Sequence, residues 1–260
     1  MTLDARDVET RTGWRVVARG VVDSTNDVAA RLRDAGADER TVVVADRQTA
    51  GRGRGGHSFS SPEGGLYASL LLRVNRADLA GPVVAAAAVA VAEALESVLG
   101  VPAEVKWPND VRVGGKKIAG LLLETGGAPD AGARAAVIVG LGINVARVPD
   151  DLPPDVAAAS TAADLHAAAP VARDDLLVAV LRKIDVRVGA LDDPARRAGL
   201  REEYRRRIAL RGARVRFYVG TTVREGRLLD ADLDRGLLVE PVAGPPVWHP
   251  AAHVLELREA

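Results

Sequence analysis

A lysine- and carboxylate-bearing segment near the middle of the chain carries side chains suited to phosphate chemistry. It reads Lys106-Trp107-Pro108-Asn109-Asp110, and Lys116 and Lys117 follow it closely. A strand, a turn and a returning strand would bring Lys117 back beside the carboxylate and the amide. Aspartate suits a hard cation such as Mg²⁺, and lysine suits charge developing on a phosphate. The segment predicts Mg²⁺–nucleotide chemistry, with a surface hairpin that carries only an ion pair as the alternative.

Lysine is rare elsewhere in the chain. Of the 35 basic residues only four are lysine, and three of these lie within residues 106–117. Chance clustering in an arginine-biased composition is one explanation. The other is that lysine persists where a compact ammonium charge is needed, because a guanidinium has a different shape and hydration.

A glycine- and arginine-rich segment over residues 48–56 contains the pattern G-x-G-x-x-G. In a dinucleotide-binding fold this pattern opens a helix, and an acidic residue follows about 20 residues later. Here the segment leads into Ser58-Phe59-Ser60-Ser61-Pro62, which cannot start such a helix, and no acidic residue lies between Gly65 and Asp78, so the dinucleotide interpretation fails. A flexible loop remains, whose backbone amides and guanidinium groups of Arg52 and Arg54 suit a phosphate or carboxylate. The alternative is a solvated surface loop.

A third motif is the pair Gly140 and Gly142 inside an otherwise apolar strand. Two glycines there predict either the close approach of a ligand or another backbone, or a tight strand crossing. Other chemistries find little support, since the chain has no G-x-S-x-G elbow, no phosphate-binding P-loop and no cysteine. His249 and His253 lack a third metal ligand, and we interpret them as structural.

The periodicity predicts the elements that position these motifs. A helix begins at the N-cap Ser24 and stops at Gly36, and a hairpin turns at residues 114–115 between strands 110–113 and 117–124. Further strands are expected at 41–45, 66–74, 101–107 and 135–145, and further helices at 79–99, 161–168, 173–191 and 194–208. After residue 213 the apolar period becomes two, as in a small β-barrel. The predicted fold is α+β, with a mixed sheet and helices over 1–208 and a small β-barrel domain over 209–260.

Composition limits the function classes. The chain has 260 residues, 48 % hydrophobic and 27 % charged, with 35 basic and 35 acidic residues. This balance predicts a globular protein that binds neither nucleic acid nor anionic membrane. Charged residues interrupt any apolar run at the start, and the longest such stretch, 83–92, is about half a membrane span. We therefore expect a cytoplasmic protein.

Five motifs in order closely resemble the biotin protein ligase (biotin–[acetyl-CoA-carboxylase] ligase) family. They cover about residues 14–145, with a weaker likeness beyond. The motifs are Asp23-Ser24-Thr25-Asn26, the 48–56 segment, Lys106-Trp107-Pro108-Asn109-Asp110, Lys117-Ile118-Ala119-Gly120 and Gly140-Leu141-Gly142-Ile143-Asn144-Val145. The resemblance implies a core similar to class II aminoacyl-tRNA synthetases and a C-terminal SH3-like β-barrel. It also implies that biotin and ATP, with Mg²⁺, give biotinyl-5′-AMP, from which biotin passes to a lysine of a biotin carboxyl carrier domain.

The resemblance also implies roles for individual residues. Catalysis would involve Lys117, Asp110 and Arg54, with Asp110 as the Mg²⁺ ligand. Biotin would be bound by Ser24, Thr25, Asn26, Gln48, Arg52, Gly53, Arg54 and Lys117. ATP would be bound by Arg52, Arg54, Lys106, Trp107, Asn109, Asp110, Asn144 and Arg258.

Two departures from the family pattern matter. Phe59 stands where the family usually has tryptophan, which leaves an aromatic ring without the indole donor. Only 23 residues precede Ser24, too few for the N-terminal helix-turn-helix domain of many bacterial relatives, so a monofunctional ligase without operator binding is expected. A lipoate- or octanoate-transferring enzyme and a non-enzymatic biotin-adenylate sensor are the alternatives, and a homodimer is left open.

Overall fold

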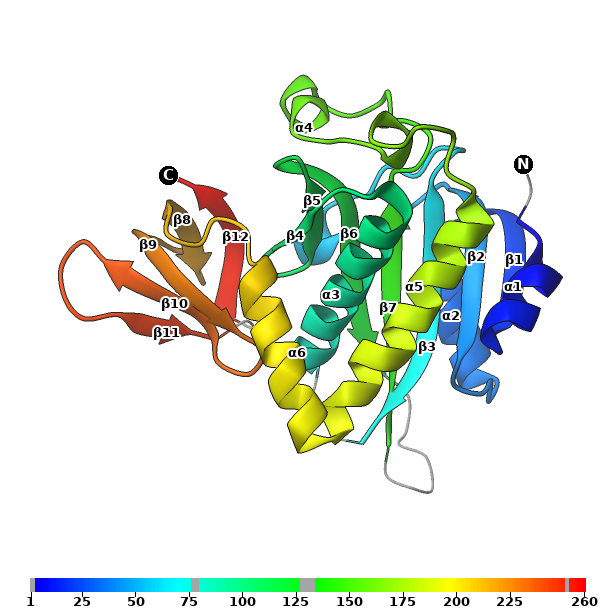
Figure 1. Cartoon of the computed structure of the whole chain (residues 1–260), viewed down its shortest axis with the longest axis horizontal. Coiled ribbons are helices and arrows are strands. Elements are labelled where there is room, and N and C mark those ends of the chain that lie inside the picture. Colours follow the sequence, from blue (N-terminus) through cyan, green and yellow to red (C-terminus); the bar gives the residue numbers. More distant parts are fainter. Residues whose placement is uncertain (1–2, 76–79, 127–133, 251–252) are drawn as a thin grey trace.

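The computed structural model describes residues 3–75, 80–126, 134–250 and 253–260. Its main feature is a seven-stranded mixed sheet in the order β1-β2-β3-β7-β6-β5-β4 (Figure 1). Only the β1–β2 pair is parallel. The strands are β1 (Arg15–Val22), β2 (Thr41–Gln48), β3 (Leu66–Val74), β4 (Ala103–Lys106), β5 (Asp110–Val113), β6 (Lys116–Thr125) and β7 (Ala135–Ile143). The predicted α+β class with a mixed sheet is confirmed.

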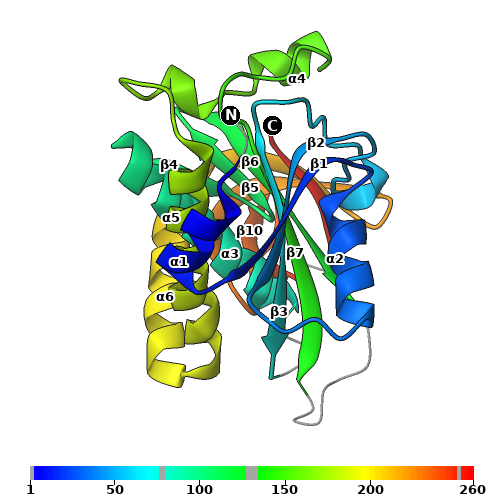
Figure 2. The same ribbon diagram turned by 90° about the vertical axis from the view of Figure 1, so that its right-hand side faces the viewer.

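The two faces of this sheet are covered unequally. On one face lie α3 (Ala80–Leu99) and α5 (Arg173–Val188), flanked by α1 (Ala5–Thr12) and α6 (Pro194–Arg207). On the other face α2 (Thr25–Asp34) packs on β2, β3 and β7 around a small core that includes Val28 and Ile138 (Figure 2). Because α2 reaches only part of its face, the sheet remains open beside it.

The apolar composition of α3 follows from its position. It packs against both α5 and the sheet, so residues 85–92 are all buried. The stretch Gly81–Leu99 is long and apolar enough to span a membrane, but 78 % of the 18-residue apolar window within it is buried inside the protein. This helix matches the predicted one, except that Leu79 lies outside the described residues.

The C-terminal part forms a separate five-stranded antiparallel sheet in the order β11-β10-β9-β8-β12, next to α6 (Figure 1). Its strands are β8 (Arg214–Val219), β9 (Thr222–Asp232), β10 (Gly236–Pro241), β11 (Val247–His249) and β12 (Val254–Glu259). Val215 and Phe217 are buried while Arg214 and Arg216 are exposed, so the predicted period of two is confirmed.

The predicted helix over 161–168 is wrong. Only a single 3₁₀ turn, Ala163–Leu165, forms there. The amide of Thr161 donates to the carbonyl oxygen of Lys117 at 2.8 Å, and the amide of Ala163 donates to that of Asn144 at 3.0 Å. These long-range bonds hold the backbone extended and override local helix propensity. The helix α1, the strand β1 and the short helix α4 (Pro154–Ala158) were not anticipated.

Candidate functional site

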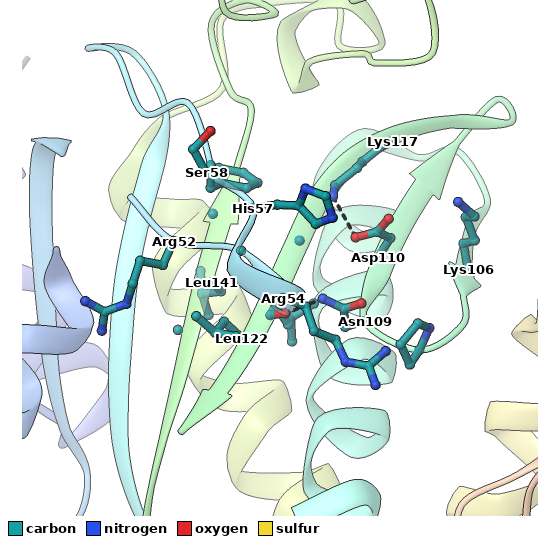
Figure 3. Close-up of a pocket in the computed structure, with 18 of the residues that line it drawn as sticks. Arg52, Arg54, His57, Ser58, Lys106, Asn109, Asp110, Lys117, Leu122 and Leu141 are labelled. Carbon is teal, nitrogen blue, oxygen red and sulfur yellow. Dashed lines mark hydrogen bonds and ion pairs between the residues drawn. The ribbon is translucent and has the colours of Figure 1, made fainter. Parts of the chain in front are cut away.

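A cavity of about 590 Å³ lies on the open face of the main sheet (Figure 3). Its walls come from the start of α2, the loop after β2, the β4–β5 turn, β6, β7 and β12. Every predicted site residue except Asn144 lines it. Asn144 is buried outside the lining, where its side-chain amide donates to the carbonyl oxygen of Thr161 at 3.0 Å.

One end of the cavity is a polar network built on the N-terminus of α2. Ser24 caps the helix, as predicted, by accepting a hydrogen bond from the amide of Asn26 at 3.3 Å. The amide and hydroxyl of Thr25 both donate to Oε1 of Gln48, at 2.8 and 3.0 Å. Nε2 of Gln48 then donates to Ser61 Oγ at 2.8 Å. The helix start is thereby locked to the end of β2.

Among the described members of this network, Asn26 has a buried side-chain donor without a hydrogen-bond partner. The residue is 4 % exposed, and its Oδ1 accepts from Ser69 Oγ at 2.5 Å. Its Nδ2 is buried and has no hydrogen-bond partner among the described residues. Such an orphaned donor is costly without a partner, so it points to a ligand that brings an acceptor.

The glycines in β7 make room for side chains. A Cβ on Gly140 would lie 2.3 Å from Asn26 Oδ1, and a Cβ on Gly142 would lie 2.3 Å from the Phe59 ring. The structure shows a close approach at both glycines, but the approaching groups are side chains of the same chain, whereas the sequence predicted a ligand or another backbone. Gly120 on β6 pairs with Gly142. A Cβ on Gly120 would lie 3.2 Å from both the Phe59 ring and the ammonium of Lys117.

The opposite end of the cavity is basic. Lys117 Nζ lies 2.7 Å from Asp110 Oδ1, across the predicted hairpin, and 5.8 Å from the centre of the Phe59 ring. Lys106 is nearby, and burial lowers its pKa while Asp110 opposes that effect. Arg258 of β12 also lines the cavity and lowers the pKa of Lys106 further. These cations are suited to holding a polyanion.

Asn109 holds the turn that carries this basic end. Its Nδ2 donates to the carbonyl oxygen of Leu121 at 2.6 Å, and the amide of Leu121 donates back to the Asn109 carbonyl at 2.8 Å. The neighbouring Trp107 is buried and forms part of the wall. The motif thus combines groups exposed to the cavity with groups that fix the turn.

The two arginines of the glycine loop point in different directions (Figure 3). Arg52 Nη1 lies 2.7 Å from Asp27 on α2, and its Nη2 lies 2.8 Å from Glu124 on β6. The hydrogen bonds that Arg52 donates to Asp27 and, to a smaller extent, to Glu124 raise its pKa. Arg54 instead donates to the carbonyl oxygen of Val254 at 3.2 Å, and burial lowers its pKa. The glycine loop therefore presents its two guanidinium groups in different directions, one toward α2 and β6 and the other toward β12.

The loop itself adopts a compact turn. The amide of Gly53 donates to the carbonyl oxygen of His57 at 2.7 Å, and Phe59 donates to Gly51 at 2.9 Å. A Cβ on Gly51 would lie 2.4 Å from the Phe59 carbonyl oxygen, so only glycine fits there. His57 is exposed but lines the cavity, as does Ser58.

The apolar lining was missed by the sequence reasoning. It is supplied by Leu121, Leu122, Leu141, Val156 and Leu257. Leu122 pairs with Gly140 and shares a face of β6 with Gly120 and Glu124. That period-two relation to Gly120 was a usable signal for Leu122. No comparable signal marks Val156 or Leu257, because they arrive from distant elements.

Comparisons with known proteins agree with this geometry. The profile of the biotin/lipoate A/B protein ligase family matches residues 19–144. The biotin–[acetyl-CoA-carboxylase] ligase of Mycobacterium tuberculosis is 34 % identical over 261 residues, covering 95 % of this chain and 91 % of that protein. The chain therefore belongs to the biotin/lipoate A/B protein ligase family, and within it to the biotin protein ligases.

Other relatives extend or limit this likeness. The bifunctional ligase/repressor BirA of Bacillus spizizenii is 40 % identical over 146 residues, but the match covers only 55 % of this chain and 44 % of that protein. Among solved structures, biotin protein ligase from Aquifex aeolicus in complex with biotin and ATP has a TM-score of 0.78 at 28 % identity. That likeness covers 94 % of this chain and 99 % of the other.

Proposed function

We propose that the protein joins biotin to ATP, giving biotinyl-5′-AMP and pyrophosphate, and then transfers biotin to a lysine of a biotin carboxyl carrier domain. The observation that carries this is the division of one cavity into a buried polar end with an orphaned donor and a basic end. Biotin has a matching division, with a neutral ureido carbonyl at one end and a carboxylate at the other. ATP supplies the polyanion for the basic end.

Biotin is oriented by the polar network. Asn26 Nδ2 donates to the ureido carbonyl, which supplies the acceptor that the buried amide lacks. Leu122 and the ring of Phe59 line the cavity where the apolar body of biotin lies. The carboxylate then points toward Lys117.

Adenylation makes a carboxylate oxygen attack the α-phosphorus of ATP, forming a C–O–P linkage while pyrophosphate leaves. Two anions must meet, so cations have to screen their repulsion and stabilise the charge of the transition state. Lys117 lies beside the carboxylate path, and Lys106 and Arg258 lie on the nucleotide side. In the second step the carrier lysine amine attacks the acyl carbon and AMP leaves. Neither step needs a nucleophile from the protein.

Mg²⁺ would enter with the nucleotide phosphates and neutralise part of their charge. Asp110 is the one carboxylate among the described residues that line the cavity. No cluster of three metal-ligating carboxylate or histidine side chains occurs in the described parts of the chain. Asp110 fits one position of a Mg²⁺ ion whose remaining ligands are phosphate and water, which is the usual arrangement for this ion.

The wider assignments follow the resemblance. They are a class II aminoacyl-tRNA synthetase-like catalytic domain over 1–208, an SH3-like barrel over 209–260, and a cytoplasmic location without DNA or membrane binding. The short antiparallel strands β8–β12 support the second of these. A homodimer could form through an edge of the main sheet.

The deciding experiment incubates the protein with biotin, ATP–Mg²⁺ and a carrier domain, and measures the mass of the carrier. One biotinyl group added to the carrier is expected, with release of pyrophosphate. Lipoate and octanoate in parallel reactions test the alternative acyl substrates. Binding of biotin and ATP without pyrophosphate release would instead identify an adenylate sensor.

A further inference from the structure

An ion-pair ladder joins α6 to the C-terminal sheet, which lie side by side in Figure 1. The arginines are Arg197, Arg201 and Arg205, and the aspartates are Asp230, Asp232 and Asp234. We call these six residues the α6–β9 ladder. Four residues of helix advance about 6 Å and two residues of strand about 6.7 Å, so the spacing of Arg201 and Arg205 matches that of Asp232 and Asp230 on β9. Asp234 follows in the turn between β9 and β10, where it meets Arg197 and Arg201.

The contacts of the ladder are close. Arg201 Nε lies 3.0 Å from Asp232 Oδ2, and Arg201 Nη2 lies 2.8 Å from Asp234 Oδ2. Arg205 Nε lies 3.2 Å from Asp230 Oδ2, and its Nη2 lies 3.4 Å from Asp232 Oδ2. Each arginine after the first therefore bridges two aspartates, which fixes the register between helix and strand.

Asp232 is the centre of the ladder. It is 5 % exposed, and its Oδ1 accepts hydrogen bonds from the amides of Asp234 at 2.9 Å and Arg235 at 3.1 Å. A buried carboxylate is stable only while its partners remain in place. The ladder consequently holds β9 against α6 and also resists sliding or tilting of β9 along the helix.

The hydrogen-bonded strands of the C-terminal sheet connect β9, which the ladder holds, to β12, which lines the cavity. β9 is hydrogen-bonded to β8, and β8 to β12. β12 contributes Leu257 and Arg258 to the cavity wall, and its Val254 carbonyl accepts a hydrogen bond from Arg54 of the glycine loop. The position of β9 on α6 therefore determines where Leu257, Arg258 and the Val254 carbonyl lie relative to the basic end of the cavity.

We propose that the α6–β9 ladder positions β12 against the basic end of the cavity, so that its six residues act as positioning residues for the nucleotide and not for biotin. This inference rests on the proposed ATP-dependent function. The polar end is built from α2, β2, Ser61 and Ser69, and none of the ion pairs of the ladder in the described structure reaches these residues. Disturbing the ladder should therefore weaken the binding of ATP and leave the binding of biotin unchanged.

The test uses the full chain with Asp234→Arg, since Asp234 is partly exposed and meets both Arg197 and Arg201. We expect KM for ATP to rise about tenfold, with kcat at saturating ATP and calorimetric Kd for biotin within about twofold of the wild type. The double variant Arg197→Asp/Asp234→Arg restores one rung with reversed polarity and should recover most of the loss. Wild-type adenylation measured alongside tests the proposed function separately.

A matched control comes from α6 itself. Arg206 lies on the same helix and is largely exposed, and its ion pair among the described residues is with Glu203 of that helix. Arg201→Gln should raise KM for ATP, while Arg206→Gln, which makes the same charge change, should not. Equal KM values in the two variants, absence of rescue by the swap, or a parallel loss of biotin affinity would each overturn the positioning role.

Discussion

The two ends of the cavity are built in different ways. The polar end consists of residues between 24 and 69 that are mostly buried, with Gln48 half-buried, and that are joined by hydrogen bonds of 2.5–3.3 Å. The basic end gathers partly exposed charges from β4, β5, β6 and β12, which come from both parts of the chain. A neutral ligand needs fixed donors and acceptors, whereas a polyanion needs accumulated charge whose exact placement tolerates more variation.

The largest expected effect concerns the basic end. Lys117→Ala should reduce adenylation a few hundred-fold, because it removes about 3–4 kcal/mol of charge stabilisation at the transition state. Pyrophosphate release at saturating biotin measures this. Lys116→Ala is the control, since Lys116 is an exposed neighbour on β6 that does not line the cavity. Near-normal turnover by Lys117→Ala would remove this residue from the mechanism.

At the polar end, Asn26→Ala should weaken biotin binding about tenfold or more, since a hydrogen bond to a buried donor is lost. The free energy of unfolding should change by less than about 1 kcal/mol, because the variant removes an orphaned donor together with the bond to Ser69. Calorimetry with biotin alone and chemical denaturation measure the two quantities. A large loss of stability with unchanged affinity would assign Asn26 a structural role only.

The glycine loop joins the two ends, and Arg54→Gly should make the enzyme leaky. It removes the contact with Val254 and a guanidinium 6.0 Å from the Trp107 ring, and frees a loop already rich in glycine. Biotinyl-adenylate should escape about tenfold faster and label lysines of an added bystander protein. Its off-rate and the bystander labelling are the measurements. Retention equal to that of the wild type would show that the loop is not a lid.

The smallest effect is expected from Glu124→Gln. Arg52 would keep Asp27 but lose one of its two partly exposed ion pairs, which are worth less than about 1 kcal/mol. The off-rate of biotin should rise about twofold or threefold, and high salt should reduce the difference from wild type. A loss as large as that of Asn26→Ala would mean that Arg52 contributes to the polar end directly.

Sequence alone predicted the features that depend on near neighbours. The cap at Ser24 and the hairpin that returns Lys117 to Asp110 follow from local residue types, and the structure has both. The strand 66–74 and the helix ending at Leu99 were also recognisable, because one-sided or continuous burial imposes a repeating pattern on the sequence. The gathering of nearly all predicted site residues around one cavity follows from the ordered motifs.

Tertiary structure decided which partner each of these groups meets. Residues 161–168 lost their predicted helix to backbone bonds with Lys117 and Asn144, which are far away in the sequence. Arg52 and Arg54 are alike in the sequence, yet one binds Asp27 and Glu124 and the other the Val254 carbonyl. The four-residue spacing of the arginines on α6 leads to a row of ion pairs only because the fold places β9 beside this helix. Local patterns encode backbone conformation and burial, but a charged side chain takes its partner from whatever the folded chain brings within a few ångströms.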